Sequence, residues 1–320
     1  GYISEKSAYH HGEASLYEGI IGMAQNFVGA NNIELLEPKG QFGSRIASGG
    51  KDSASPRYIF TNLSELSFHI FNPLDNPILQ YNEDDGKKIE PVWYIPIIPM
   101  ILVNGTSGIG TGFSTDVPPH DPEIIVKNLF LLMDDKPLEK MIPWFRGFKG
   151  VIEFKGVNDI GIEQYINKGV FKVVDPTTLL IEELPIGRWT DNYKTYLESL
   201  LYDKNVENKA KKQCLMDFMN NSTDKTINFT LKFKKEDLAE LMAKGELERI
   251  LKLTDTSYTN YSNMHLYNNK EVITKYETPE DIITEFYFIR LAFYVKRKEY
   301  MLKTMKRELD IIKSKVRFIE

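Results

Sequence analysis

The last part of the chain, from Pro279 to Glu320, is the feature that most limits the possible folds. Its apolar residues recur at alternating spacings of four and three positions, with charged residues between them. This pattern is typical of one long helix with a coiled-coil seam. The seam residues are Ile282, Phe286, Ile289, Phe293, Met305, Leu309, Ile312, Val316 and Ile319. No returning partner helix follows, so we expect a truncated coiled-coil stem over residues 279–320.

The first part of the chain mixes helical spacing with glycine-bearing turns. A helix is predicted through Leu16, Ile20, Met23 and Phe27, because these residues form one face, and Gly29 is placed to end it. A short extended segment is predicted at Tyr58-Ile59-Phe60, followed by a helix through Ile70. Helix, glycine-bearing loop and extended segment suit a small winged-helix type of module.

Residues from about Pro143 to Tyr276 alternate short strand-like runs with short helices, which predicts mixed α+β structure. The chain as a whole is therefore expected to be an α+β multidomain protein. We divide it into a winged-helix domain at 1–142, a mixed β domain at 143–278 and the stem at 279–320. Predicted strands are 150–154, 170–174, 178–181 and 227–233, and predicted helices are 122–133, 193–201 and 235–242.

Composition excludes several classes of protein. The single cysteine, Cys214, rules out an internal disulfide framework and a cysteine-rich zinc site. No apolar run approaches the ~18 residues needed to cross a bilayer, so no membrane partner is expected. The formal net charge of -5 does not announce a nucleic-acid partner, so a DNA-binding surface would have to be a local patch. Both ends of the sequence look cut, and we expect a fragment of a larger protein.

Tyr58 is the candidate for covalent chemistry, because it directly follows Arg57. A tyrosine hydroxyl can attack phosphorus and hold a phosphodiester as an ester, which conserves bond energy for rejoining. A free phenol, with a pKa near ~10, is a poor nucleophile and needs activation together with cationic donors for the phosphate oxygens. Arg57 supplies a planar cation suited to phosphate. In an extended segment, however, the two side chains would point to opposite faces.

Two further segments carry residue types that suit DNA. His10 and His11 lie just before a predicted helix, where imidazoles and free backbone N–H groups can donate to phosphate. Ile109 is an apolar residue between two glycines in the loop Asn104 to Gly112, and an isolated aliphatic tip can wedge between base pairs. The same loop could suggest a nucleotide-binding enzyme acting through Gly108. It lacks the Gly-Lys-Ser/Thr ending of a phosphate loop, and no βαβ unit surrounds it.

Taken together and in order, short segments along nearly the whole chain resemble the DNA-cleavage core of eukaryotic-type DNA topoisomerase II. Each one alone is a weak signal, whereas the ordered set is specific. The segments are Tyr9-His-His-Gly-Glu, Ala24-Gln-Asn-Phe-Val-Gly, Gly40-Gln-Phe-Gly, Gly49-Gly-Lys-Asp, Pro56-Arg-Tyr-Ile-Phe, Glu90-Pro-Val-Trp-Tyr, Asn104-Gly-Thr-Ser-Gly-Ile-Gly-Thr-Gly, Pro143-Trp-Phe-Arg-Gly, Leu184-Pro and Arg188-Trp-Thr.

The resemblance implies a role for each matching residue. Tyr58 is then the nucleophile that forms a 5′-phosphotyrosyl link, Arg57 stabilises the transition state, and Ile109 intercalates and bends the DNA. Region 143–278 becomes a tower with a shoulder. The implied DNA contacts are Tyr9, His10, His11, Ser15, Lys51, Ile109 and Trp189. One departure lies before Lys51, where the stretch from Arg45 to Gly50 is one residue longer than usual.

The resemblance also implies partners and cofactors. The family acts on double-stranded DNA as a homodimer in the nucleus, and it uses Mg²⁺ and ATP. The Glu-Gly-Asp and Asp-x-Asp motifs of its metal-binding domain do not occur here, so both cofactors are expected to bind segments outside this chain. No metal site and no small-molecule substrate are expected within it. The alternative to a cleavage core is a non-catalytic module that bends or scaffolds DNA.

Overall fold

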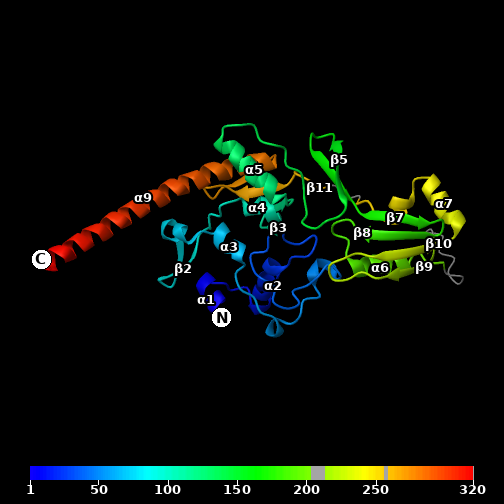
Figure 1. The fold of residues 1–320 in the computed structure, drawn as a ribbon, viewed down its shortest axis with the longest axis horizontal. Coiled ribbons are helices and arrows are strands. Elements are labelled where there is room, and N and C mark those ends of the chain that lie inside the picture. The colour runs from blue at the N-terminus through cyan, green and yellow to red at the C-terminus, as the bar shows by residue number, and fades with distance from the viewer. Residues whose placement is uncertain (203–212, 256–258, 320) are drawn as a thin grey trace.

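The computed structural model describes residues 1–202, 213–255 and 259–319. It has mixed α/β architecture and an elongated shape, in which one long helix projects from a body of helices and small sheets (Figure 1). Within the described ranges, no helix combines the length and apolar character that a bilayer crossing requires.

The N-terminal part is made of short helices and turns. The predicted helix through Phe27 forms but ends at Ala24, earlier than the expected stop at Gly29, because Gln25 turns to an extended conformation with φ -67° and ψ 131°. The helices and single-turn 3₁₀ helices of this part are α1 (Tyr2–Ser7), α2 (Glu13–Ala24), η1 (Ser48–Gly50), η2 (Pro56–Tyr58), α3 (Glu65–Ile70) and η3 (Pro73–Ile78).

Two hairpins and two helices follow. The acidic stretch is a tight hairpin turn in which Asp85 and Gly86 both have positive φ, as the twist of a two-residue turn demands. The predicted glycine-rich loop at 104–112 is a second hairpin, with Gly108 paired to Thr115. The elements are β1 (Tyr81–Asp84), β2 (Lys87–Pro91), α4 (Met100–Asn104), β3 (Thr106–Gly110), β4 (Phe113–Val117) and α5 (Pro122–Met133).

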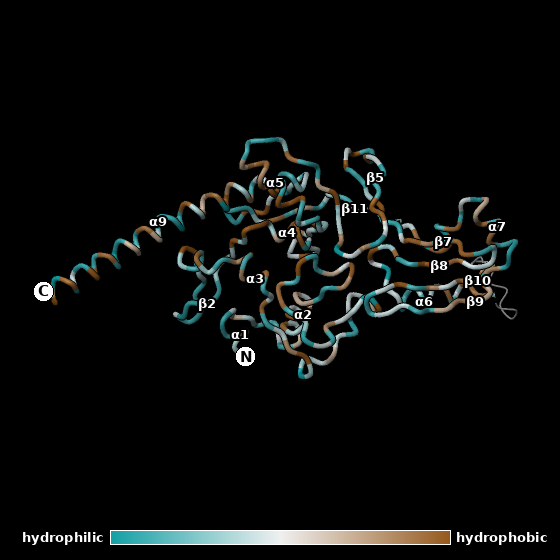
Figure 2. Tube along the Cα trace, viewed as in Figure 1, coloured by the Kyte–Doolittle hydropathy of each residue, from teal (hydrophilic) through white to brown (hydrophobic). Residues whose placement is uncertain are grey.

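Two further sheets form the far end of the body. One has the strand order β7-β8-β10-β9 and the other β11-β6-β5. Leu179, Phe229 and Leu231 of the larger sheet pack against Leu197 of α6 and Leu238 of α7 in one apolar core, which lies in the brown stretches of these elements in Figure 2. The elements are β5 (Val151–Val157), β6 (Glu163–Lys168), β7 (Val170–Asp175), β8 (Thr178–Glu183), α6 (Thr190–Glu198), β9 (Leu215–Asn220), β10 (Phe229–Phe233), α7 (Lys235–Ala243), α8 (Leu247–Ile250) and β11 (Thr259–Asn260).

A second apolar core lies where the long helix starts. It brings Leu102 of α4 and Ile125 of α5 together with Tyr165 of β6, Met264 of β12 and Ile283 of α9. Residues on both sides of position 142 thus share one core, while the domain boundaries themselves remain predictions. The last elements are β12 (Met264–Tyr267), β13 (Ile273–Tyr276) and α9 (Pro279–Ile319).

Helix α9 begins at the predicted residue for a local reason. Thr278 and Asp281 exchange bonds: the Thr278 hydroxyl accepts from the Asp281 N–H at 3.1 Å, and the Asp281 carboxylate accepts from the Thr278 N–H at 3.0 Å. This is a capping box, and Pro279 occupies the first helical position. The helix is described to Ile319, and Glu320, where the predicted stem ends, lies outside the described residues.

A buried carboxylate fastens α9 to the N-terminal part. Asp75 of η3 pairs with Arg290 at 2.8 Å and with Arg297 at 3.3 Å, and both guanidinium groups lie over the ring of Tyr294. Arg290 also donates to the carbonyl of Ile95 at 3.2 Å. Because Asp75 and Arg290 are almost fully buried, this ion pair is poorly screened by solvent and holds the root of the stem.

Candidate active site

The segment that carries Tyr58 is held as one strand of an irregular antiparallel pair. Lys39 and Phe60 exchange backbone hydrogen bonds of 3.0 Å in both directions, and the N–H of Ala54 donates to the carbonyl of Gln41 at 2.9 Å. Tyr58 therefore lies on a loop anchored on both sides rather than on a free turn.

Tyr58 itself ends a 3₁₀ turn, Pro56–Tyr58, and the predicted extended conformation at this residue is wrong. The Tyr58 N–H donates to the carbonyl of Ser55 at 2.9 Å, a bond that closes the turn. In a 3₁₀ turn successive side chains are about 120° apart, so neighbours do not point to opposite faces. The Arg57 guanidinium accordingly lies 4.8 Å from the centre of the Tyr58 ring.

The Tyr58 side chain is open to solvent. It is 67% exposed, and Arg57 is exposed as well. A planar cation and a phenol hydroxyl thus share one accessible surface, which is the arrangement that attack on a phosphodiester needs.

Glycine-bearing sequence motifs elsewhere in this part turn out to be the support of the loop. The Gln25 amide donates to the carbonyls of Phe42 at 2.9 Å and Gly50 at 3.3 Å, and so ties the end of α2 to two turns. A Cβ on Gly43 would lie 2.2 Å from the Gly50 carbonyl oxygen, so neither turn has room for a side chain there. The glycines serve close packing of turns and do not cradle phosphate.

Lys51 follows the turn η1 and is exposed. The longer stretch noted before it is accommodated in that turn, where Gly49 adopts φ 64°. Asp52 fixes the other side, because its carboxylate accepts from the N–H of Ser44 at 2.8 Å and from the Ser44 hydroxyl. Lys51 is thereby held next to a fixed turn with its charge free to reach solvent.

The histidine segment lies at the start of α2. His10, His11 and Ser15 are exposed, while Tyr9 is half-buried with its ring 5.4 Å from that of His11. No side chain caps α2, so its first N–H groups remain available to an anion. Within the described part of the chain, no hydrogen bond or ion pair joins Tyr58 to either histidine.

Ile109 lies near the tip of the β3–β4 hairpin and is 93% exposed. The alternative of an isoleucine tucked into the core is therefore wrong. A strand hairpin also differs from the strand–loop–helix of a phosphate loop, which removes the structural basis for nucleotide binding at Gly108.

Asparagine side chains hold this hairpin against the part that carries Tyr58. Asn32 donates to the carbonyls of Val103 at 2.9 Å, Trp144 at 3.1 Å and His120 at 3.3 Å. Asn104 accepts from the Ile33 N–H and donates to the Ile33 carbonyl, both at 2.9 Å. Sequence reasoning missed Asn32, whose only signal is an amide directly before the apolar Ile33.

Trp189 is half-buried and connects two parts of the chain. Its ring meets that of Phe27 edge-on at 5.7 Å, and a Cβ on Gly29 would lie 3.5 Å from it. Close by, the N–H of Thr190 donates to the carbonyl of Arg45 at 3.2 Å, and Arg45 forms a buried ion pair with Glu183. Much of the Trp189 ring is thus used for packing, and only its remaining surface is accessible.

The described residues do not form a metal site. Among them, no group of three His, Cys, Asp or Glu side chains is arranged to hold a metal ion. The acidic pair at Asp84 and Asp85 is part of an exposed hairpin turn. These residues therefore do not fit a Mg²⁺ site, and no reaction step is routed through one here.

The fold and this exposed Arg57–Tyr58 pair match a class of solved structures. The crystal structure of the Plasmodium falciparum topoisomerase II DNA-binding, cleavage and re-ligation domain superposes with a TM-score of 0.88 at 44% identity, over 96% of this chain and 40% of that chain. A family model for the A-type chain of DNA gyrase/topoisomerase IV matches residues 1–320, and the chain belongs to that family.

Full-length relatives agree with this assignment. The chain is 48% identical to DNA topoisomerase 2 of Arabidopsis thaliana over 319 residues, which is 100% of this chain and 21% of the relative. It is 42% identical to DNA topoisomerase 2-alpha of Gallus gallus, with 100% and 20% covered. The chain thus spans about a fifth of the length of these relatives. The resemblance drawn from the motifs is confirmed.

Proposed function

We propose that this chain is the part of a type II DNA topoisomerase that holds duplex DNA and breaks it through Tyr58. The observation that carries the proposal is the accessible phenol with a guanidinium stacked 4.8 Å from its ring, in a chain of this family. The reaction is transient double-strand cleavage, strand passage and religation, driven by ATP in the whole enzyme.

The chemistry assigned to Tyr58 is a displacement at phosphorus. Its Oη forms the new P–O bond to the 5′ side of the break, the bond from phosphorus to the 3′ oxygen breaks, and the phenol proton is lost as the 3′ hydroxyl gains one. Arg57 binds the phosphate oxygens as negative charge builds on them. Religation is the same displacement in reverse, so no high-energy cofactor is consumed in rejoining.

The remaining site residues are assigned to DNA binding. Tyr9, His10, His11, Ser15 and Lys51 contact the backbone near the broken bond, and the free N–H groups of α2 add to this anion site. Ile109 enters the base stack and bends the duplex. Trp189 presents its remaining accessible surface to DNA.

The larger organisation follows the same family reading. Residues 1–142 act as the winged-helix domain, 143–278 as tower and shoulder, and 279–320 as the start of a coiled-coil stem. The enzyme works as a nuclear homodimer in which each Tyr58 cuts one strand. Mg²⁺ and ATP bind segments outside this chain.

The decisive experiment replaces one hydroxyl in the full-length enzyme. Native protein, Tyr58→Phe and the control Tyr267→Phe, which alters another exposed tyrosine, are mixed with DNA and Mg²⁺ and stopped with detergent. Protein-linked DNA is expected from native enzyme and from the control, and none from Tyr58→Phe. Equal adduct from all three proteins would show that another group is the nucleophile.

A second experiment separates cleavage from bending. Ile109→Gly is expected to reduce the bend angle of bound DNA, measured by energy transfer between dyes at the duplex ends. Ile160→Gly is the matched control, because Ile160 is also an exposed isoleucine in a hairpin turn. If the bend is unchanged in Ile109→Gly, that residue does not intercalate. A bend without any adduct in native enzyme would favour the non-catalytic DNA-bending module.

A further inference from the structure

The free part of α9 has a charge opposite to that of the rest of the chain. Residues 296–319 contain nine basic and three acidic side chains, which gives a net charge of +6, whereas the whole chain carries -5. The rest of the chain therefore carries -11. Such a concentration of positive charge on a projecting helix focuses a positive potential away from the acidic body.

Eight of these nine cations have no ionic partner. Arg297 is paired with Asp75, but none of the other eight takes part in an ion pair within the described residues, and each is exposed. Acidic side chains lie on the same helix, yet the helix does not use them to neutralise its lysines and arginines. The unpaired set is Lys296, Lys298, Lys303, Lys306, Arg307, Lys313, Lys315 and Arg317.

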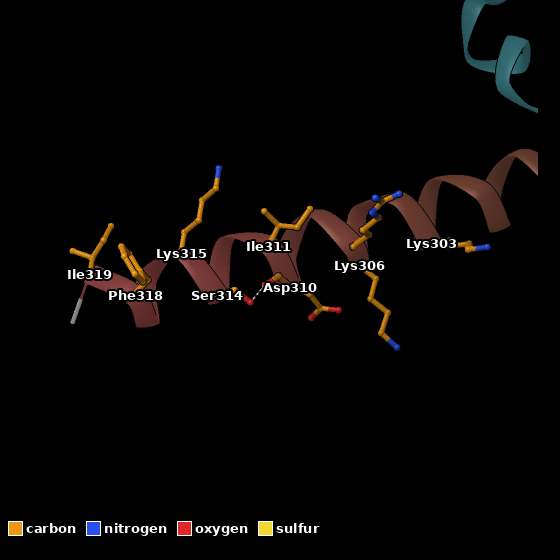
Figure 3. A pocket seen from close by; sticks show the side chains of 9 residues that line it. Lys303, Lys306, Asp310, Ile311, Ser314, Lys315, Phe318 and Ile319 are labelled. Carbon is orange, nitrogen blue, oxygen red and sulfur yellow. Dashed lines mark hydrogen bonds between the residues drawn. The ribbon is translucent and has the colours of Figure 1, made fainter.

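Most of the unpaired cations lie along one side of α9. At 3.6 residues per turn, six of them fall within about a third of the circumference, and this sector does not overlap the apolar seam. We call it the basic sector, and its cations are Lys296, Lys303, Lys306, Arg307, Lys313 and Arg317. A helix that packs on the seam would therefore leave the basic sector uncovered. Figure 3 shows Lys306 and Lys315 extending in opposite directions from a helix with no other element beside them.

The basic sector contains no apolar side chain. Its remaining members over residues 296–317 are Glu299, Asp310 and Ser314. A stable protein interface needs a desolvated apolar or aromatic centre, and a membrane-bound helix needs apolar residues that enter the lipid on the bound side. Lysine and arginine with an occasional hydroxyl are instead the residue types that contact the phosphates of a nucleic acid.

The spacing of the charges along the axis also suits a regular polyanion. From Lys296 to Arg317 the helix rises about 32 Å, close to the ~34 Å of one turn of B-DNA. The cations are spread along this length rather than clustered at one point. A duplex presents phosphates throughout such a span, so several contacts can form at once.

We propose that the basic sector of α9 binds the phosphate backbone of a second segment of duplex DNA, separate from the segment cleaved at Tyr58. This inference rests on the proposed function, which supplies duplex DNA as the partner. Binding is independent of base sequence, because lysine and arginine contacts to phosphates carry no sequence information. It is strongly dependent on salt, since each neutralised phosphate releases counterions.

The test neutralises four cations of the basic sector in the full-length enzyme. Lys303, Lys306, Arg307 and Lys313 are all changed to Gln. A control variant changes Lys127, Lys136, Lys172 and Lys244 to Gln; it loses the same charge, but each of these lysines is already paired with an acid. One short duplex is first trapped as the Tyr58 adduct, and binding of a second, labelled duplex is then titrated from about 50 to about 200 mM salt, an experimental range chosen for its effect on phosphate contacts.

Native enzyme and control are expected to bind the second duplex alike. In the sector variant its affinity should fall at least roughly tenfold at low salt, and the salt slope should shrink by about 3 to 4. The yield of the Tyr58 adduct should be unchanged. An unaltered affinity and slope, or an equal loss in the control, would overturn the proposal.

Two further arms decide between polyanions and between the two proposals. If polyglutamate or vesicles containing phosphatidylserine compete as well as DNA does at equal charge, the basic sector is not a DNA site and the inference fails. If native enzyme forms no adduct, the second duplex is titrated without trapping. A sector-dependent loss in that case supports the basic sector while the proposed cleavage function fails.

Discussion

A Cβ on Gly40 would lie 2.8 Å from Cγ2 of Ile59, the residue directly after Tyr58. Gly40 has φ 120°, a conformation that residues with a side chain rarely adopt. The side chain of Ile59 is β-branched at the contact and cannot swing away. Gly40 therefore sets how closely the Tyr58 segment approaches its antiparallel partner.

We expect Gly40→Ala to lower the yield of protein-linked DNA by roughly tenfold to a hundredfold, because a shift of about 1 Å in a reacting group has effects of this size. The adduct is measured in the full-length enzyme after a detergent stop. Gly161→Ala is the control, since Gly161 has φ 84° but no atom within 4 Å of the added carbon. Equal adduct from both variants would contradict the role of Gly40.

Asn32 allows a test of how the hairpin is mounted. Its amide faces three carbonyl oxygens, so Asn32→Asp replaces two N–H donors with a buried anion that these oxygens repel. The loss in free energy of unfolding should be about 3 to 5 kcal/mol, on the scale of a buried unpaired charge. Denaturant titration measures it, and acidification should recover part of it as the carboxyl protonates. Asn269→Asp, at an exposed position, should change little.

Asp75 should be the costliest single residue to neutralise at the root of the stem. Asp75→Asn leaves the buried Arg290 and the partly buried Arg297 without their carboxylate, and breaking a buried pair from one side costs about 3 to 5 kcal/mol. Asp310→Asn removes the same charge from an exposed turn of α9 and should be nearly neutral. Unfolding of the two variants in urea gives the comparison, and a difference below about 1 kcal/mol would argue against the clamp.

His120 predicts a specific acid sensitivity. Burial lowers its pKa from 6.5 to about 4, and its ring lies between the Leu102 carbonyl and the Tyr261 hydroxyl. Because the unfolded chain takes up the proton first, the free energy of unfolding should fall as pH drops from about 6.5 to 4, by about 3 kcal/mol in all. Comparison with His120→Gln isolates this term: the variant should lose less stability over that window. Identical pH profiles would refute the assignment.

The sequence could predict the elements whose periodicity is local. Helices Pro122–Met133 and Pro279–Ile319 follow the predicted spans because a cap, a proline at the first position and a continuous apolar spacing all act within a few residues. Strands β7, β8 and β10 lie within two residues of their predictions for the same reason.

Long-range contacts could not be predicted in this way. Nothing near Tyr58 in sequence specifies the pairing with Lys39 and Gln41 that bends it into a 3₁₀ turn. Glycines at 104–112 suggested a loop, but pairing with residues 113–117 makes them a hairpin. The identity of Tyr58, Arg57 and Ile109 as candidates came from an ordered set of motifs, whereas the mount formed by Asn32 and the buried partner of Arg45 needed coordinates.

The double bond between Asn104 and Ile33 has a consequence for how DNA would be read. If the wedge at Ile109 and the cutter at Tyr58 are fixed to one rigid frame, the interval between kink and nick is a constant ruler length along the helix axis. Sites would then be chosen by whether a pliable base step falls at that set offset, and changing the letters at the nick itself would matter less.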